Sequence, residues 1–263
     1  MLSTLDTDIP PFYFYASLAQ IKLTLEYIQI YFLNSKILQY FLSRNHFYIK
    51  HFRQQVCKPN FYWAMKRSKR YTSYRMYTTI IFDFFGVIHN NQYSEWLSRH
   101  GVERTGQFAE LSDKANVGKI SIKEFFDGIA KLSGQNYEEV KNEFQVNTRL
   151  DPKVIDVIEF LRKSGYKIGL LSNASSGYIY GVKGFKEISE LFDEIIVSGD
   201  VGMAKPDPKF FDFALKKLGC KPSETIFIDD GYSNVEASNA LGIKGVHFLN
   251  VDQLIKELDT LLR

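Results

Sequence analysis

The stretch IIFDFFGV (residues 80–87) joins a short apolar run to a polar turn. Its first three residues, Ile80-Ile81-Phe82, are typical of a strand that is buried on both faces, as in a parallel sheet. Asp83 ends the run, and Gly86 three residues later indicates a tight turn. Open α/β sheets bind ligands at the carboxyl ends of their strands, so Asp83 is a candidate functional residue.

Alternating strand and helix patterns continue after residue 150. Asp151-Pro152 and Asp207-Pro208 are typical of a helix N-cap followed by proline at the first helical position. Gly165 and Gly219 are expected to close these two helices. The alternation predicts an α/β fold with a Rossmann-like parallel sheet that helices cover on both faces. We expect strands over 166–171, 194–198, 225–228 and 245–249, and further helices over 233–241 and 251–262.

Residues 91–146 show a different pattern, with apolar residues at helical spacing and no buried strand. The most regular part is the group Phe125, Phe126, Ile129 and Leu132. We expect a helical insertion after the first strand, placed to cover the carboxyl ends of the strands as a small cap. The predicted domains are an α/β core over 76–90 and 147–263 and a helical cap over 91–146.

Residues 1–75 differ sharply in composition from the rest of the chain. They hold 11 of the 33 Lys and Arg, only 3 of the 30 Asp and Glu, and none of the 17 glycines. We expect an aromatic, basic N-terminal extension, either folded as short helices or not native, with Met76 as the true start. The basic cluster at 66–70, with its neighbouring tyrosines up to residue 75, favours a solvated linker over a nucleic-acid contact.

Composition and a few single residues exclude several classes of protein. Cys57 and Cys220 are the only cysteines and the five histidines are scattered, so we expect neither a disulfide framework nor a zinc site. Lys22 and Glu26 interrupt the apolar stretch 11–33, and the first residues lack a basic region. We therefore predict a cytoplasmic protein with no membrane partner and no nucleic-acid partner.

Polar side chains gather where the predicted strands end. Asp83, Ser172-Asn173, Lys205 and Asp229-Asp230 each follow a strand, and these strand ends meet at one edge of a parallel sheet. Three carboxylates at one place repel unless a divalent cation lies among them, and hard oxygen ligands favour Mg²⁺. A lysine beside Mg²⁺ suits a phosphoryl group, and a carboxylate can attack phosphorus to form an acyl phosphate.

These residues, in this order, resemble the motifs of the haloacid dehalogenase-like (HAD) hydrolase superfamily. The motifs are Asp83, then Ser172, then Lys205-Pro206-Asp207-Pro208, then Asp229-Asp230. The resemblance covers residues 78–250, and residues 116–126 look like the small helical cap of its phosphatase and dehalogenase branch. It implies the HAD-like α/β core with that cap inserted after the first strand.

The resemblance also implies a role for each motif residue. Asp83 would be the catalytic nucleophile, and Ser172 with Asn173 would bind the phosphoryl group. Lys205 would bind substrate and neutralise the charge of the nucleophile and of the phosphoryl group. The implied Mg²⁺ ligands are the side chains of Asp83, Asp229 and Asp230 and the backbone carbonyl of Phe85.

Phe85 marks a departure from the family pattern. Phosphatases of the superfamily usually carry a second Asp here, which protonates the leaving oxygen and then activates water, and Phe85 can do neither. General acid–base catalysis contributes typically about 10²–10⁴ in rate, so its loss would leave a slow phosphatase unless another group substitutes. The candidate substitutes are His89 and the cap residues Glu95, Asp113 and Lys119, among which the sequence does not choose.

The expected function is Mg²⁺-dependent hydrolysis of a small phosphorylated metabolite, a phosphomonoester, through an aspartyl-phosphate. One alternative is a weakly active or inactive domain that binds a phosphorylated ligand or partner. A second is a 2-haloacid dehalogenase, since such enzymes carry an aromatic residue at the position of Phe85. Against it stand the retained pair Asp229-Asp230 and Val87, where dehalogenases usually have threonine. The sequence predicts neither the substrate nor the oligomeric state.

Overall fold

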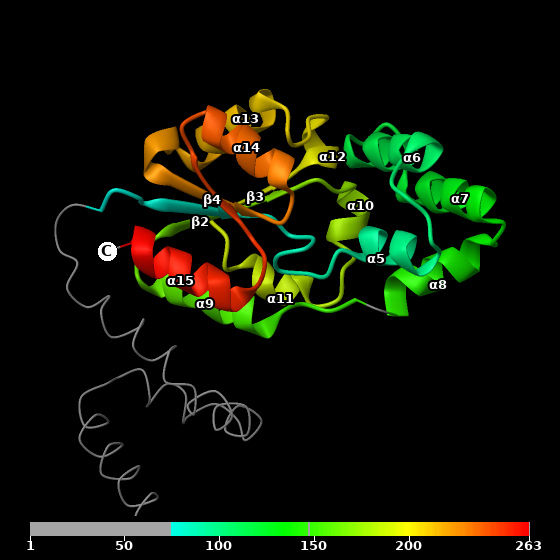
Figure 1. Cartoon of the computed structure of the whole chain (residues 1–263), viewed down its shortest axis with the longest axis horizontal. Helices are drawn as coiled ribbons and strands as arrows, with labels where there is room; N and C mark the ends of the chain where they lie inside the picture. The colour runs from blue at the N-terminus through cyan, green and yellow to red at the C-terminus, as the bar shows by residue number, and fades with distance from the viewer. Residues whose placement is uncertain (1–74, 147, 263) are drawn as a thin grey trace, which may run out of the picture. The chain divides into compact units, whose positions relative to one another are not determined.

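The described part of the chain is built around one parallel sheet. The structure is a computed structural model that describes residues 75–146 and 148–262. The predicted N-terminal extension therefore lies, up to residue 74, outside the described residues. The sheet has the order β3-β2-β1-β4-β5, and all its neighbouring strands run parallel (Figure 1). Its strands are β1 (Thr79–Phe82), β2 (Lys167–Ser172), β3 (Glu194–Val197), β4 (Thr225–Asp229) and β5 (Lys244–His247).

Helices cover both faces of this sheet, as the sequence predicts. Successive residues of a strand point to opposite faces, so Ile80 and Phe82 enter one apolar core and Ile81 enters the other. The first core is closed by α9 (Pro152–Lys163), α11 (Phe185–Ser189) and α15 (Val251–Leu261). The second is closed mainly by α13 (Pro208–Leu218), and α14 (Tyr232–Ala240) lies beside it on the same side of the sheet (Figure 1).

The structure confirms the predicted N-capping residues of α9 and α13. The side chain of Asp151 accepts a hydrogen bond from Lys153 N at 2.9 Å, and Asp207 accepts one from Lys209 N at 2.9 Å. Gly219 closes α13 in the left-handed region with φ 60°. Three short helices not predicted from the sequence follow β2 and β3, namely α10 (Ser176–Ile179), α11 and α12 (Ser198–Val201).

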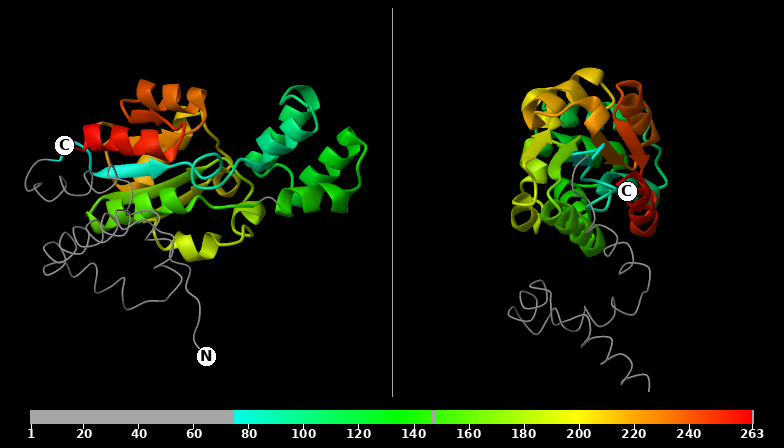
Figure 2. Two further views of the ribbon diagram at one scale, coloured as in Figure 1. Left: turned by 60° about the horizontal axis from the view of Figure 1, so that its bottom comes forward. Right: turned by 90° about the vertical axis from the view of Figure 1, so that its left-hand side faces the viewer.

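A helical insertion between β1 and α9 forms a cap with its own apolar core. Its helices are α5 (Gln92–Arg99), α6 (Gly106–Asn116), α7 (Ile122–Ser133) and α8 (Tyr137–Val146). Trp96, Ile129 and Val140 are fully buried among them. The cap stands beyond the end of the sheet, as Figure 2 shows. The expected helical insertion after the first strand is thus confirmed.

The two chain segments that connect the cap to the core run side by side. Asn90 N donates to Arg149 O at 3.2 Å, and Asp151 N donates to Ile88 O at 2.8 Å. These bonds join the cap to the core at one place.

Among the helices of residues 75–146 and 148–262, none is long and apolar enough to cross a bilayer.

Candidate active site

The turn after β1 places Asp83 beside the end of β4. Asp83 is buried, and its Oδ1 accepts a hydrogen bond from Phe84 N at 2.7 Å. Gly86 has φ 90°, which confirms the predicted tight turn. A Cβ at Gly86 would lie 2.0 Å from Asp230 Oδ2, so only glycine lets the turn approach this carboxylate. Local backbone geometry therefore brings two carboxylates, from β1 and β4, to the same place.

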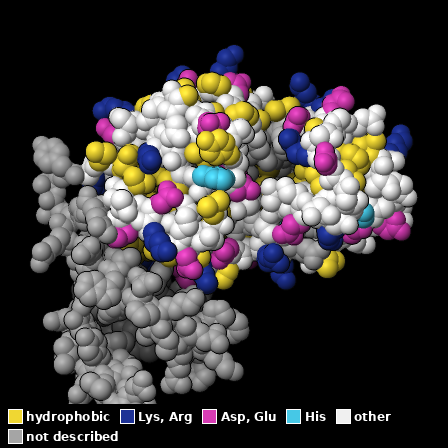
Figure 3. Space-filling view, viewed as in Figure 1, with side chains coloured by type: hydrophobic (Ala, Val, Ile, Leu, Met, Phe, Trp, Pro, Cys, Tyr) yellow, Lys and Arg dark blue, Asp and Glu magenta, His cyan; other side chains and the backbone are white. Residues whose placement is uncertain are grey.

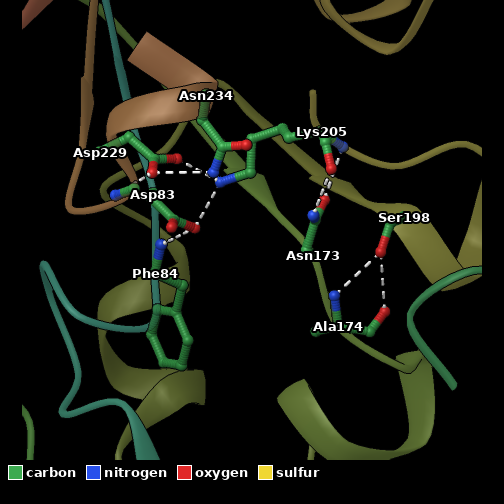
Figure 4. A network of polar contacts seen from close by, with 9 residues as sticks. Asp83, Phe84, Asn173, Ala174, Ser198, Lys205, Asp229 and Asn234 are labelled. Atoms are coloured by element: carbon green, nitrogen blue, oxygen red, sulfur yellow. Dashed lines mark hydrogen bonds and ion pairs between the residues drawn. The ribbon is translucent and has the colours of Figure 1, made fainter. Parts of the chain in front are cut away.

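Lys205 lies between the carboxylates of Asp83 and Asp229 (Figure 4). Its Nζ is 2.8 Å from Asp83 Oδ1 and 2.6 Å from Asp229 Oδ2. The side chains of Lys205 and Asp229 are 1% and 0% exposed. Buried charges need close partners of opposite sign, so this lysine is required wherever both carboxylates are ionised.

Burial and neighbouring charges shift the pKa values of Asp83, Lys205 and Asp230. Burial raises the pKa of Asp83 well above its ordinary value; Lys205 opposes this shift and Asp229 adds to it. Burial acts to lower the pKa of Lys205, but Asp229 and Asp83 outweigh it, so this pKa lies above its ordinary value. Burial and Asp229 also raise the pKa of Asp230. One lysine thus does not compensate three carboxylates, and a further cation is favoured here.

The three carboxylates fit a divalent metal ion. Asp83, Asp229 and Asp230 each offer one oxygen, and these oxygens lie within 4.8 Å of one another. An all-oxygen donor set of this charge suits Mg²⁺. Phe85 belongs to the same turn as Asp83, and the role of its carbonyl as a fourth ligand stays a prediction.

The end of β2 and the loop after it supply the remaining predicted residues, Ser172 as the last residue of the strand and Asn173 as the first of the loop. Ser172 is fully buried, and its hydroxyl has no hydrogen-bond partner within the described residues. An unpartnered buried hydroxyl is costly, which favours a ligand as its partner. Asn173 uses both ends of its amide on the backbone of Lys205: Nδ2 donates to Lys205 O and Oδ1 accepts from Lys205 N, each at 2.8 Å. The structure thus places the Asn173 side chain on the lysine segment.

Asn234 is a site residue that the sequence analysis missed. Its Nδ2 donates to Asp229 Oδ1 at 2.9 Å, and Gly231 N donates to the same oxygen at 2.7 Å. These bonds orient the carboxylate so that Oδ2 faces Lys205. The available signal was an amide in the first turn of the helix that follows Asp229-Asp230-Gly231.

A cavity of about 710 Å³ lies between the core and the cap. The core contributes Asp83, Phe85, Asn173, Lys205 and Asp230 to its lining, so five of the predicted site residues face it. The cap contributes amide, hydroxyl, aromatic and charged side chains. Those on its side include Asn91, Gln92, Tyr93, Ser94, Arg104, Ser112, Asp113, Asn116, Phe125 and Phe126.

Phe85 is fixed in an aromatic wall of this cavity. Its ring stacks on Tyr178 with a centroid distance of 5.7 Å and an interplanar angle of 20°. The Tyr178 hydroxyl donates to Gln92 Oε1, and Gln92 Nε2 donates to Phe144 O. This chain of contacts joins the turn after β1 to two cap helices and leaves the Phe85 ring at the predicted position of the missing acid.

The four candidate substitutes for that acid lie in different places. His89 is 2% exposed, and its ring packs against Phe84 at a centroid distance of 5.3 Å outside the cavity lining. Glu95 accepts a hydrogen bond from Asn90 Nδ2 at 2.9 Å and does not line the cavity. Lys119 lines a separate depression on the cap. Only Asp113 among these four lines the cavity, where it forms an ion pair with Arg104.

Curated proteins with similar sequences include phosphatases. A D-ribitol-5-phosphate phosphatase of Bacteroides thetaiotaomicron is 31% identical over 192 residues, which are 64% of this chain and 90% of that protein. A phosphoglycolate phosphatase of Pseudomonas putida is 27% identical over 148 residues, 56% of this chain and 54% of that protein.

The fold also matches solved structures. A HAD family enzyme of B. thetaiotaomicron, in complex with magnesium and inorganic phosphate, superposes with a TM-score of 0.51 at 22% identity. The superposition covers 65% of this chain and 93% of that one. The family model of haloacid dehalogenase-like hydrolases matches residues 77–242. This chain therefore belongs to the haloacid dehalogenase-like hydrolases and resembles the bacterial phosphatases among them.

Proposed function

We propose that this chain hydrolyses a small phosphomonoester, with Mg²⁺ as its cofactor and Asp83 as its nucleophile. The observation that carries this proposal is the buried lysine between two carboxylates: Lys205 Nζ is 2.8 Å from Asp83 and 2.6 Å from Asp229. A lysine held there is suited to neutralise a phosphoryl group that enters beside Asp83. The cavity in front of the site lies between the core and the cap and has a volume of about 710 Å³, which suits a small substrate.

The metal-binding part of the proposal rests on the carboxylate cluster. Asp83, Asp229 and Asp230 would hold the ion, with the carbonyl of Phe85 as a further ligand. When bound, Mg²⁺ supplies positive charge to the phosphoryl oxygens and lowers the repulsion between them and an attacking carboxylate. The magnesium and phosphate complex of the related B. thetaiotaomicron enzyme supports this choice of ion.

Hydrolysis would proceed in two steps at phosphorus. An oxygen of Asp83 attacks the phosphorus atom, the ester P–O bond breaks, and the alcohol leaves with a proton from solvent or from a cavity group. The Ser172 hydroxyl donates a hydrogen bond to a phosphoryl oxygen, while Lys205 offsets the negative charge of the phosphoryl group. Asn173 keeps the Lys205 backbone in place. Water then attacks phosphorus, the bond to Asp83 breaks, and the carboxylate and inorganic phosphate are released.

Phe85 restricts the kind of substrate that this site can hydrolyse well. It offers no proton to the leaving oxygen, so the leaving group must be stable without early protonation. A sugar 1-phosphate or an acyl phosphate meets this condition better than an ordinary alkyl phosphate. The same residue favours the second candidate function, in which the domain binds a phosphorylated ligand or partner without turnover.

Phosphate release from a panel of phosphomonoesters and acyl phosphates tests the proposal. The full chain is assayed with Mg²⁺ and with a chelator, and Asp83→Asn serves as the matched control. We expect release that requires Mg²⁺ and that the variant loses. Stoichiometric binding of inorganic phosphate with no release from any compound would instead support the binding role. Halide release from 2-haloacids without metal would support the dehalogenase alternative.

A further inference from the structure

A cap loop contacts the core at a site separate from the two connecting segments. Ser198, the first residue of α12, is fully buried, and its hydroxyl donates to the backbone oxygen of Asn116 at the end of α6. Asn116 belongs to the cap and Ser198 directly follows β3 in the core. The bond therefore joins two parts of the chain that are 82 residues apart.

Close backbone packing accompanies this hydrogen bond. Gly118, two residues after Asn116, has φ +71°. A Cβ at Gly118 would lie 2.7 Å from the carbonyl oxygen of Gly199, closer than real Cβ atoms approach an oxygen. Only glycine at position 118 allows the cap loop to pack this closely against the backbone of Gly199. We call Asn116, Gly118, Ser198 and Gly199 the cap latch.

The core half of the latch also holds the segment 172–174, which consists of Ser172 at the end of β2 and the first two residues of the following loop. Ser198 Oγ accepts a hydrogen bond from Ala174 N at 2.9 Å (Figure 4). Gly199 N also donates a hydrogen bond to Ala174 O at 3.0 Å. Ala174 lies two residues after Ser172. The position of the 172–174 loop thus depends on the same hydroxyl that contacts the cap.

The Ser198 hydroxyl has two acceptors and one proton. Its oxygen reaches Asn116 O in the cap, and it also lies 3.3 Å from Ala174 O in the core. A hydroxyl donates one hydrogen bond at a time, and donation strengthens it as an acceptor for another donor. In this structure the proton can serve Asn116 O in the cap. Without that acceptor the hydroxyl would turn to Ala174 O, and the contact between Ser198 and Ala174 would rearrange.

We infer that Ser198 and Gly118 are positioning residues that couple docking of the cap to the geometry of the 172–174 loop. The inference rests on the proposed function for the role of that loop in binding the phosphoryl group. The loop then takes its binding geometry only when the cap encloses the cavity, so that the phosphoryl group is held best when solvent is excluded. The latch makes no contact with the reacting atoms and acts through Ala174.

The first test compares two glycine variants of the full chain. Gly118→Ala places a methyl group against Gly199, whereas Gly134→Ala creates the same left-handed strain (φ +72°) in the cap with no atom within 4 Å. Amide hydrogen exchange at Ala174, followed by NMR without ligand, reports the coupling. We expect exchange roughly tenfold faster in Gly118→Ala than in Gly134→Ala, the factor that 1.4 kcal/mol gives. Equal exchange in both variants overturns the inference.

The second test separates positioning from stability. Ser198→Ala is compared with Ser238→Ala, because Ser238 is equally buried and its hydroxyl bonds to Val235 O within α14, away from the cap. With p-nitrophenyl phosphate and Mg²⁺, we expect kcat to fall roughly 10–100-fold in Ser198→Ala only, since small misplacement of a reacting group has that effect. A similar fall in kcat for both variants overturns the inference.

The two tests keep failure of the inference distinct from failure of the proposed function. The exchange measurement needs no turnover and judges the latch whether or not the chain hydrolyses the probe. Unequal exchange together with no phosphatase activity would support the latch and contradict the proposed reaction. Equal exchange together with Mg²⁺-dependent activity would support the proposed reaction and contradict the latch.

Discussion

The core side and the cap side of the cavity are held by different forces. On the core side, Lys205 and Asp229 are almost completely buried and joined by short bonds. On the cap side, the ion pair of Arg104 and Asp113 has side chains that are 48% and 65% exposed. On the outer face that Figure 3 draws, positive and negative side chains are likewise interspersed. The groups proposed for phosphoryl chemistry are therefore held firmly in place, while the charged groups on the cap side can change at little cost in stability.

The largest effect is expected from Lys205→Met. The substitution removes the cation between two buried carboxylates, and breaking a buried ion pair costs about 3–5 kcal/mol. We expect a lower midpoint in thermal unfolding without Mg²⁺ and a partial recovery when Mg²⁺ is added, because a cation again lies among the carboxylates. Phosphate release is expected to be lost.

A cap lysine provides the matched control for this change. Lys123 lies 2.7 Å from Asp127 in α7, a distance like that of the Lys205 pairs, but its side chain is 71% exposed. Lys123→Met is expected to leave the free energy of unfolding almost unchanged, because water screens this exposed pair. Equal destabilisation by the two substitutions would remove the distinction between the two sides of the cavity.

Phe85→Asp tests whether the aromatic wall limits the chemistry. The new carboxyl group would supply the missing proton donor, so we expect kcat for alkyl phosphates to rise by about 10²–10⁴. The rise should be smaller for p-nitrophenyl phosphate, whose leaving group needs less protonation. Phe85→Asn removes the same stacking on Tyr178 without supplying a proton. A gain of the same size in both variants would show that the ring blocks the substrate rather than replaces an acid.

Local sequence patterns predicted much of the fold and placed the main charged residues. Buried strands must be apolar, and helix starts need capping groups, so the run at 80–82 and the caps at Asp151 and Asp207 have visible signatures. The same reasoning puts Asp83 and Asp229 at neighbouring strand ends, where the structure brings them to one lysine. These features depend on residues close together in the chain.

Contacts between distant segments have no such signature. The family resemblance implies that Asn173 lies near the phosphoryl group, and Asn173 does line the cavity. A strand end does not fix the direction of the next side chain, so the two bonds of its amide to the Lys205 backbone could not be predicted. The Ser198 bond to Asn116 and the stacking of Phe85 on Tyr178 depend on how the cap settles on the core. No local pattern encodes that placement, so these contacts required the structure.

Gly86→Ala is expected to weaken metal binding with a moderate effect on stability. The added Cβ would lie 2.0 Å from Asp230 Oδ2, and the residue would keep φ +90°, which strains alanine by about 1–3 kcal/mol. Displacement of Asp230 should lower the affinity for Mg²⁺ in calorimetric titration. Gly219→Ala is the control, because Gly219 is also left-handed (φ +60°) but has open space around it. This variant should be less stable than the unchanged chain and should bind Mg²⁺ with the same affinity. Equal affinities in the two variants would exclude a role for Asp230 in holding the ion.

The smallest effect is expected from Asp113→Asn, which changes the charge of the cap side alone. Arg104 loses its partner, and because both side chains are exposed, unfolding should change by only about 0.2–1 kcal/mol. The freed guanidinium still lines the cavity and would attract a second anionic group on the substrate. Relative kcat/KM should therefore shift a few-fold, roughly what 1 kcal/mol gives, toward phosphomonoesters that carry a carboxylate. An unchanged preference, measured on carboxylate and neutral substrates of similar size, would show that the leaving group does not reach this part of the cap.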